Sequence, residues 1–312
     1  MRMTQRPMQA LVAACLLLTA SARASATEYA FSTYALGESA FGAGVTPPPG
    51  TYATAVTGFY SGKIGTTVEF GNVVINAGAK VEFFTSGLNV LYVPDRKLLG
   101  GNLGLSVTVP VGHNDVEATL GVGPFAASRE VDGWGLGDVV SRAQLGWQQG
   151  ALSYTLYVQA VAPTGKYETG FFPIIGLNRP GIDTGGAFTW TDKPTKLQFN
   201  GTAGFTFNFE NTATDYTSGN EFHFEWAIGR ELCPGLVVGI VGYDYRQLTA
   251  DSGAGDVLGA FEGRVDAIGP GLTYTTVIHT TPLVFNLRYY HEFNAENRWE
   301  GDSTIASGTV RF

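Results

Sequence analysis

The sequence predicts an all-β fold, a transmembrane antiparallel up-and-down β-barrel. Apolar and polar residues alternate over segments whose length matches a tilted membrane strand of about 9–11 residues. Charged residues make up only 15% of the 312-residue chain, against roughly a quarter in a soluble domain. After residue 26 the sequence has no apolar run as long as the about 20 residues of a membrane helix. Apolar residues spread by alternation are typical of a membrane barrel.

The clearest alternation covers residues 197–209, where Leu and Phe alternate with Gln, Asn and Thr. Residues 151–162, 220–230 and 283–292 repeat the pattern. Phe, Tyr and Trp gather near the ends of these segments, as in the aromatic girdles of membrane barrels. We therefore expect these segments to be membrane-spanning strands.

Short connections alternate with longer loops that are rich in glycine and acidic residues. Short turns at one end and long loops at the other are typical of a bacterial barrel. The expected short connections are 94–99, 148–150, 192–196, 231–235 and 278–281, and the expected loops are 111–135, 163–184, 210–219, 249–262 and 294–302. The pattern predicts about twelve strands over residues 72–312, with fourteen as the second choice.

The N-terminus has the three parts of a secretory signal peptide. Arg2 and Arg6 are followed by apolar residues 10–20 and by the small residues of an Ala-Ser-Ala cleavage site at 24–26. We expect residues 1–26 to be removed and the mature chain to start near Thr27. A competing interpretation is a lipoprotein box that ends in an acylated cysteine at position 15, but the apolar stretch before it is short.

Loss of the signal peptide changes the charge and the cysteine count. Arg2, Arg6 and Arg23 are removed with no acid, so 19 basic residues become 16 against 27 acidic ones, a net charge of −11. No nucleic-acid partner is expected, because phosphate binding needs clustered Lys and Arg. Cys233 is then the single cysteine, so no internal disulfide or cysteine metal site is expected.

Residues 27–71 fit the barrel pattern less well. Residues 46–50 (Thr-Pro-Pro-Pro-Gly) do not suit a central strand, because proline lacks the backbone donor. We expect residues 27–50 to be an N-terminal segment that plugs the lumen. Residues 51–62 are either a further strand or a portion of that plug.

The last expected strand ends at Phe312, with Val310, Gly308 and Ala306 on the same face. A terminal aromatic residue on an alternating strand resembles the assembly signal of outer-membrane proteins. The expected location is therefore the bacterial outer membrane. The expected partners are its lipid and lipopolysaccharide, the barrel-assembly machinery and periplasmic chaperones.

Several stretches occur together in one order along the chain: 47–52 (Pro-Pro-Pro-Gly-Thr-Tyr), 135–138, 162–167, 215–223, 242–249, 267–270, 288–298 and 300–303. On these stretches the chain resembles the outer-membrane family associated with the meta-pathway of phenol degradation, often called SphA-like. The resemblance implies passive uptake of small hydrophobic or aromatic compounds, and it supplies no catalytic or binding residues. The alternative is a structural or surface-interaction barrel without transport.

Charged and histidine residues on the last strands form the candidate lumen lining. Opposite charges there offset one another's desolvation, which either holds the lumen together or selects what passes. A charged lining favours polar solutes, which conflicts with a hydrophobic cargo. The candidates are Glu221, His223, Glu225, Asp244, Arg246, Arg264, Asp266, Arg288 and Glu292.

The loop at 163–184 contains the apolar run Phe171, Phe172, Ile174 and Ile175. As a candidate mouth loop it either folds into the barrel entrance and meets an apolar solute, or packs on the rim or on lipid. Both interpretations stay open.

No enzyme, cofactor or metal site is expected. The four histidines show no zinc-ligand spacing. His223 lies between two glutamates, but no serine in a recognisable motif is near it. The glycine-rich stretch 133–137 does not open a helix after a strand, so it does not suit a nucleotide loop.

Overall fold

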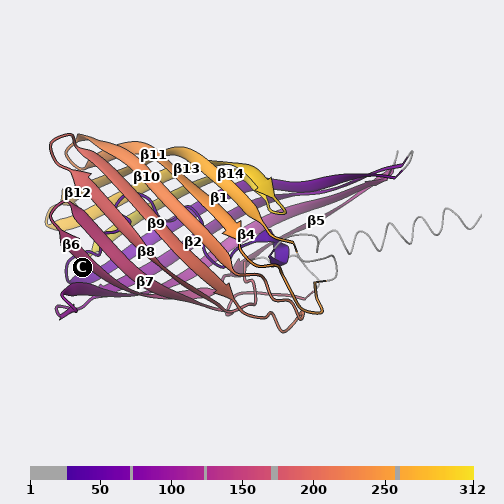
Figure 1. Ribbon diagram of the computed structural model, residues 1–312, viewed down its shortest axis with the longest axis horizontal. Helices are drawn as coiled ribbons and strands as arrows, with labels where there is room; N and C mark the ends of the chain where they lie inside the picture. The colour runs from indigo at the N-terminus through magenta and orange to yellow at the C-terminus, as the bar shows by residue number, and fades with distance from the viewer. Residues whose placement is uncertain (1–26, 71–72, 123–124, 170–174, 257–260) are drawn as a thin grey trace, which may run out of the picture.

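The computed structural model describes residues 27–70, 73–122, 125–169, 175–256 and 261–312. They form a β-barrel, and a short 3-10 turn, η1 (Glu28–Ala30), precedes the strands (Figure 1). Among these residues no helix is long and apolar enough to cross a membrane.

Within the described residues, twelve antiparallel strands form the closed wall. β1 (Gly50–Phe70) pairs with β2 (Val73–Val93) on one side and with the last strand, β14 (Glu300–Arg311), on the other, which closes the barrel. The remaining wall strands are β4 (Gly101–Val122), β6 (Val139–Gln149), β7 (Leu152–Ala162), β8 (Gly181–Asp192), β9 (Leu197–Asn208), β10 (Glu221–Cys233), β11 (Leu236–Gln247), β12 (Arg264–Ile278) and β13 (Thr281–Glu296). The predicted barrel and its first choice of twelve strands are confirmed.

Two further strands add to the wall. β3 (Lys97–Leu98) forms a small hairpin with the start of β4, and β5 (Phe125–Leu136) pairs with the second half of β4. The loop expected at 111–135 is therefore wrong. β1, β2, β4 and β5 project well beyond the other strands (Figure 1). Both faces of these projecting segments meet water, so polar residues occur there within strands and do not indicate a loop.

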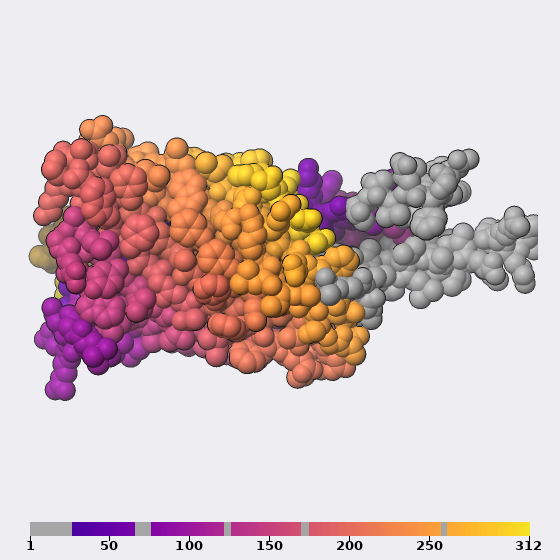
Figure 2. All heavy atoms as spheres, viewed as in Figure 1, coloured from indigo at the N-terminus to yellow at the C-terminus, as the bar shows by residue number. Residues whose placement is uncertain are grey.

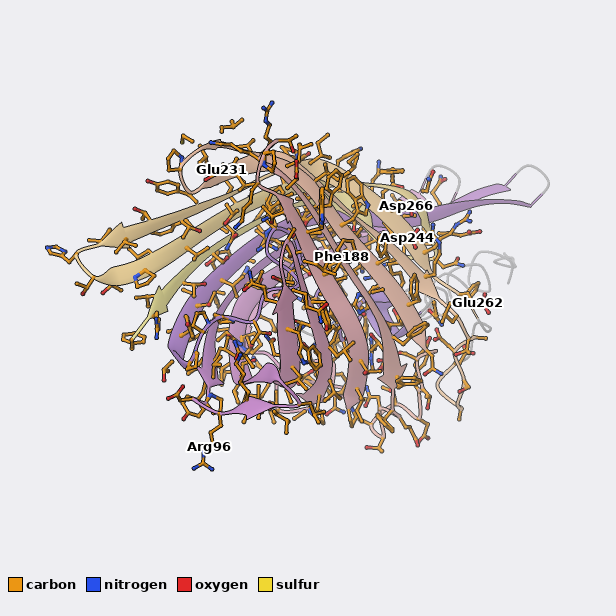
Figure 3. All side chains as sticks on the ribbon, turned by 60° about the vertical axis from the view of Figure 1, so that its left-hand side comes forward. Arg96, Phe188, Glu231, Asp244, Glu262 and Asp266 are labelled. Atoms are coloured by element: carbon orange, nitrogen blue, oxygen red, sulfur yellow. The ribbon has the colours of Figure 1, made fainter. Side chains whose placement is uncertain are left out.

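The outer face of the wall is apolar. On β9, Phe205 and Phe207 point outward while Thr206 and Asn208 are buried inside. Leu156, Phe188, Ile228 and Phe285 are outward-facing members of the same layer. The space-filling view shows side chains covering this wall (Figure 2), and Figure 3 places Phe188 in its middle. A broad exposed apolar layer is unfavourable in water, and it suits a barrel that spans the bacterial outer membrane.

The first described residues, 27–49, run through the lumen and are called the plug here. At the end with the long loops, Thr27 binds Asp251, and at the other end Arg311 binds the carbonyl of Pro49. The wall begins at Gly50, before the expected boundary at residue 72, and residues 51–62 lie in β1. Three prolines end the plug because they cannot donate to the ladder, and β1 starts directly after them.

Candidate functional site

The inner face of β10 carries three buried titratable residues. Glu221, His223 and Glu225 are each 1% exposed, and they point inward because they alternate with the outward-facing Phe222 and Phe224 along the strand. All three were predicted from the sequence to line the lumen, and the structure places them there.

The plug supplies hydrogen-bond donors to the two glutamates of β10. Tyr34 donates its hydroxyl to Glu225 Oε1 at 2.5 Å, and the backbone N–H of Ser39 donates to Glu225 Oε2 at 3.0 Å. Ser32 donates to Glu221 through its hydroxyl. Buried carboxylates are costly unless they are hydrogen-bonded. The glutamates therefore fix the plug to this side of the lumen.

His223 joins a second strand and the plug. Its Nε2 lies 3.0 Å from Asp183 Oδ2 on β8, and its ring stacks on Tyr34 with the ring centroids 3.6 Å apart. The sequence interpretation missed Asp183 because residues 163–184 were assigned to a loop. The alternation of Ile182, Phe188 and Trp190 with polar residues after Gly181 was the signal for a strand.

Two predicted residues on β13 also face the lumen. Arg288 is 7% exposed, and it donates to the carbonyls of Gly37, at 2.8 Å, and of Glu38 in the plug. Glu292 accepts hydrogen bonds from the hydroxyls of Tyr60 and Tyr243, each at 2.7 Å. These contacts hold the plug and tie β13 to neighbouring inner side chains.

The structure places the other predicted lumen residues on the outer face, so their assignment to the lumen needs correction. Tyr243 and Tyr245 of β11 pair with Glu225 and His223 and share their inward side. Their neighbours therefore point outward: Asp244, Arg246, Arg264 and Asp266.

These four residues face outward because they lie at the rim, the end of the barrel wall beyond the membrane-spanning part. Figure 3 places Asp244 and Asp266 toward the end that bears the long loops. There Arg246 pairs with Asp244 at 2.5 Å and with Asp266 at 2.8 Å, and Arg264 pairs with Glu296 at 2.7 Å. At the rim the outer face is in contact with water and headgroups, so charges stand outside and tyrosine rings stand inside. Alternation cannot distinguish the two faces there.

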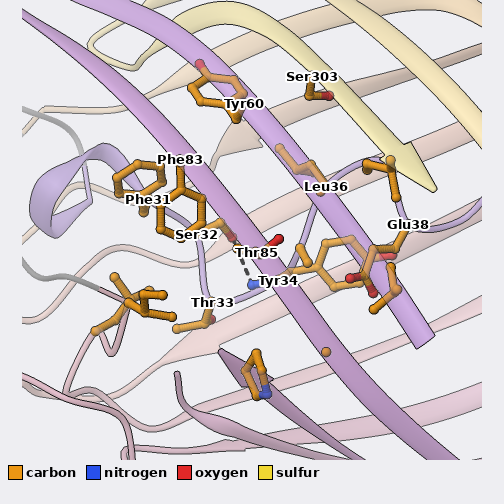
Figure 4. A pocket seen from close by; sticks show the side chains of 18 of the residues that line it. Phe31, Ser32, Thr33, Tyr34, Leu36, Glu38, Tyr60, Phe83, Thr85 and Ser303 are labelled. Carbon is orange, nitrogen blue, oxygen red and sulfur yellow. Dashed lines mark hydrogen bonds between the residues drawn. The ribbon is translucent and has the colours of Figure 1, made fainter. Parts of the chain in front are cut away.

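An apolar cavity of about 310 Å³ lies between the plug and the wall. Phe31, Leu36 and Tyr34 contribute to it from the plug, and Tyr60 and Phe83 from β1 and β2 (Figure 4). The rings of Phe31 and Phe83 are 5.8 Å apart between centroids. The plug is bound to the β8–β10 and β13 side of the lumen, which leaves this space on the β1–β2–β4 side.

Ile175 is the described member of the predicted mouth loop, and it lines this cavity. Its side chain fits over Gly112 and Gly137, where an added Cβ would lie 2.4 Å and 2.7 Å from Ile175 carbon atoms. Gly137 lies between β5 and β6. The other members of the loop, Phe171, Phe172 and Ile174, lie outside the described residues.

Charged side chains on the cavity are few. Three acidic residues, Glu38, Asp138 and Glu292, and one arginine, Arg298, line it. The Asp138 carboxylate accepts hydrogen bonds from the backbone N–H groups of residues 165 and 177. The Glu38 carboxylate makes no hydrogen bond to any described residue. The cavity is thus a largely apolar space that includes one carboxylate without a hydrogen bond to any described residue.

Phe312 is 78% exposed, and its N–H donates to the Thr51 carbonyl at 2.9 Å. Its role as an assembly signal stays a prediction. In the described portion of the chain no three His, Cys, Asp or Glu side chains gather as a metal-binding group.

Comparison with known proteins agrees with this architecture. Residues 42–307 match the model of a family described as MetA-pathway of phenol degradation, which confirms the resemblance. The chain is similar to the COG4313 outer membrane channel from Pseudomonas putida F1, with a TM-score of 0.67 and 15% identity over 86% of this chain and 97% of that one. It also aligns with a FadL homologue from Pseudomonas aeruginosa, with a TM-score of 0.40 and 9% identity over 84% of this chain and 89% of that one. No curated protein sequence matches the chain.

Proposed function

The chain belongs to the family described as MetA-pathway of phenol degradation, and on that premise we propose that it is a passive outer-membrane channel for small hydrophobic or aromatic compounds. The observation that carries the proposal is the cavity of about 310 Å³ between plug and wall. Small-molecule sites are commonly apolar cavities of about 300–1,000 Å³ with a few polar groups. Aromatic side chains from both plug and wall suit a flat aromatic solute.

Charge refines the expected solute. Three acidic residues and one arginine line the cavity, and the Glu38 carboxylate makes no hydrogen bond to a described residue, although Arg288 and Arg142 attract it electrostatically. A carboxylate in a low-dielectric space repels anions and accepts hydrogen bonds from neutral hydroxyl or amino groups. We therefore expect neutral aromatic compounds, and those with a hydrogen-bond donor, to pass in preference to aromatic carboxylates.

The direct test is initial uptake of a labelled neutral monoaromatic compound by cells that lack the gene and by complemented cells, with a small sugar as the control for leakiness. A loss of aromatic uptake alone is the expected result. Equal uptake of both solutes in the two strains would overturn the transport proposal.

The charge preference has a separate test. Glu38→Gln keeps the size of the side chain and removes its charge. It is expected to raise the uptake of benzoate relative to phenol several-fold, because the anion then meets less repulsion. An unchanged ratio, at equal amounts of protein in the outer membrane, would show that Glu38 does not select the solute.

One observation favours a second function, a structural barrel without transport. The plug runs from one end of the lumen to the other and is bound to the wall by Glu221, Glu225 and Arg288. A filled barrel of this kind needs no cargo. Equal uptake in the two strains, with folded protein present in the outer membrane, would support this alternative.

A further inference from the structure

The first residue of the plug makes a buried contact across the molecule. Thr27 has no exposed surface, and its backbone nitrogen donates to Asp251 Oδ2 at 2.8 Å. Asp251 lies in the loop between β11 and β12, at the end with the long loops. The plug therefore spans the whole lumen between this loop and the start of β1.

Asp251 is a buried carboxylate surrounded by donors. It is 4% exposed, and Oδ1 accepts from the N–H of Gly219 and from Gln247 Nε2, each at 2.7 Å. Oδ2 accepts from the Tyr216 hydroxyl at 2.5 Å and from the Thr27 nitrogen. Burial raises the pKa of the Asp251 carboxyl, and its hydrogen bonds oppose that rise.

The Asp251 carboxylate has no countercharge in the part of the chain that the structure describes, because no Lys, Arg or His side chain there lies within ion-pair distance of it. Buried charges in proteins are normally paired. The four donors that bind Asp251 are neutral groups, so within the described part of the chain the carboxylate has hydrogen bonds but no paired cation.

Removal of the predicted signal peptide would supply that cation. Hydrolysis of the bond between Ala26 and Thr27 gives the hydroxyl of water to the Ala26 carbonyl carbon and a proton to the released nitrogen, which gains another proton at neutral pH. We infer that Asp251 is the docking site for the free α-ammonium group of Thr27. The neutral amide donor then becomes a charged donor, which makes a stronger hydrogen bond to a carboxylate.

The neighbouring contacts make this docking specific for residue 27. The backbone N–H of Glu28 donates to the Ser218 hydroxyl at 3.1 Å, and Arg179 donates to the carbonyls of Glu28, at 3.2 Å, and of Phe31. Thr27, Tyr29 and Ala30 have φ values of 59°, 65° and 60°. L-residues rarely adopt this left-handed conformation, so it persists only with the full set of contacts.

The docking is tested on the full-length protein purified from outer membranes. Mass spectrometry identifies the mature N-terminus, and an amine-reactive acylating reagent at neutral pH measures how fast that terminus is labelled in folded and in urea-unfolded protein. Thr27 is expected as the first residue. Its labelling in folded protein is expected to be slower by about tenfold or more, which corresponds to one pKa unit or more.

Three variants locate the effect. Asp251→Asn removes the charge, and a glycine inserted between Ala26 and Thr27 moves the ammonium one residue away while Asp251 stays intact. Both are expected to restore fast labelling, whereas Asp256→Asn in the same loop is not. Heat-dependent gel migration checks that each variant is folded. If Asp251→Asn does not fold, the glycine-insertion variant alone tests the docking.

Three results would overturn the inference: a mature N-terminus other than Thr27, equal labelling of folded and unfolded wild-type protein, or undiminished protection in the insertion variant. None of these results depends on which solute crosses the barrel.

Discussion

At the scale of single residues, position relative to water decides what a charge contributes. Arg288 is buried and donates to plug carbonyls, so its loss leaves buried acceptors unpaired. Arg264 and Glu296 are both more than half exposed at the rim, and exposed ion pairs contribute about 0–1 kcal/mol. Two arginines that look alike in the sequence therefore have different roles.

Arg288→Gln is expected to lower the free energy of unfolding by about 1.5–3 kcal/mol, the range for hydrogen bonds from a charged group. Arg264→Gln is the matched control and is expected to change it by less than about 1 kcal/mol. The measurement is the temperature at which the folded gel band converts to the unfolded one. Equal shifts for the two variants would contradict the assignment of Arg288 to the lumen and Arg264 to the rim.

Tyr34→Phe removes the hydroxyl that donates to Glu225 at 2.5 Å and keeps the ring that stacks on His223. A destabilisation of about 1–3 kcal/mol is expected, because a buried carboxylate loses a donor. Tyr92→Phe on the outer face, where Tyr92 is 52% exposed, is the control and should be neutral. A stable Tyr34→Phe protein would show that this bond does not hold the plug.

At the scale of elements, the plug depends on close backbone approach to the wall. A Cβ added at Gly44 would lie 2.5 Å from backbone atoms of Phe188 and from the carbonyl oxygen of Ser153. Gly44 also donates to Thr189 and accepts from Thr155, each at 3.0 Å. Glycine is therefore required at this position because the wall has no room for a side chain.

Gly44→Val is expected to displace the plug and to increase sugar leakage through the barrel. Gly42→Asn is the control, because nothing lies within 4 Å of a Cβ at Gly42 and its φ of 78° suits asparagine. The readout is entry of a small sugar into proteoliposomes. Unchanged entry with Gly44→Val would mean that the plug tolerates the clash without moving.

The strands were the most predictable elements. Within the membrane, the outer face of each strand contacts lipid and the inner face contacts the polar lumen. Residues 197–209 therefore alternate between apolar and polar types, and this alternation predicts their strand. Beyond the membrane both faces of β4 and β5 meet water, the alternation fades, and residues 111–135 resemble a loop. Asp183 was missed for a related reason, because the expected loop extended into β8.

At the scale of the whole molecule, the barrel and plug together form the site. Glu221, His223, Glu225, Arg288 and Glu292 were predictable as lumen residues because a charge in the membrane-spanning region must face inward. Their partners in the plug were not, since residues 27–49 have no periodic pattern that places them. The cavity likewise arises from long-range contacts, between Phe31 and Phe83 for example, and no local sequence signal shows it.

One pair of variants tests whether the cavity takes part in uptake. Thr85 faces the cavity from β2, whereas Thr57 on β1 points outward toward Ser86. Initial uptake of a labelled neutral monoaromatic compound is measured in cells with equal amounts of Thr85→Trp or Thr57→Trp in the outer membrane. Uptake is expected to fall to the level of cells without the gene for Thr85→Trp alone. Wild-type uptake by Thr85→Trp would show that aromatic solutes do not pass through this cavity.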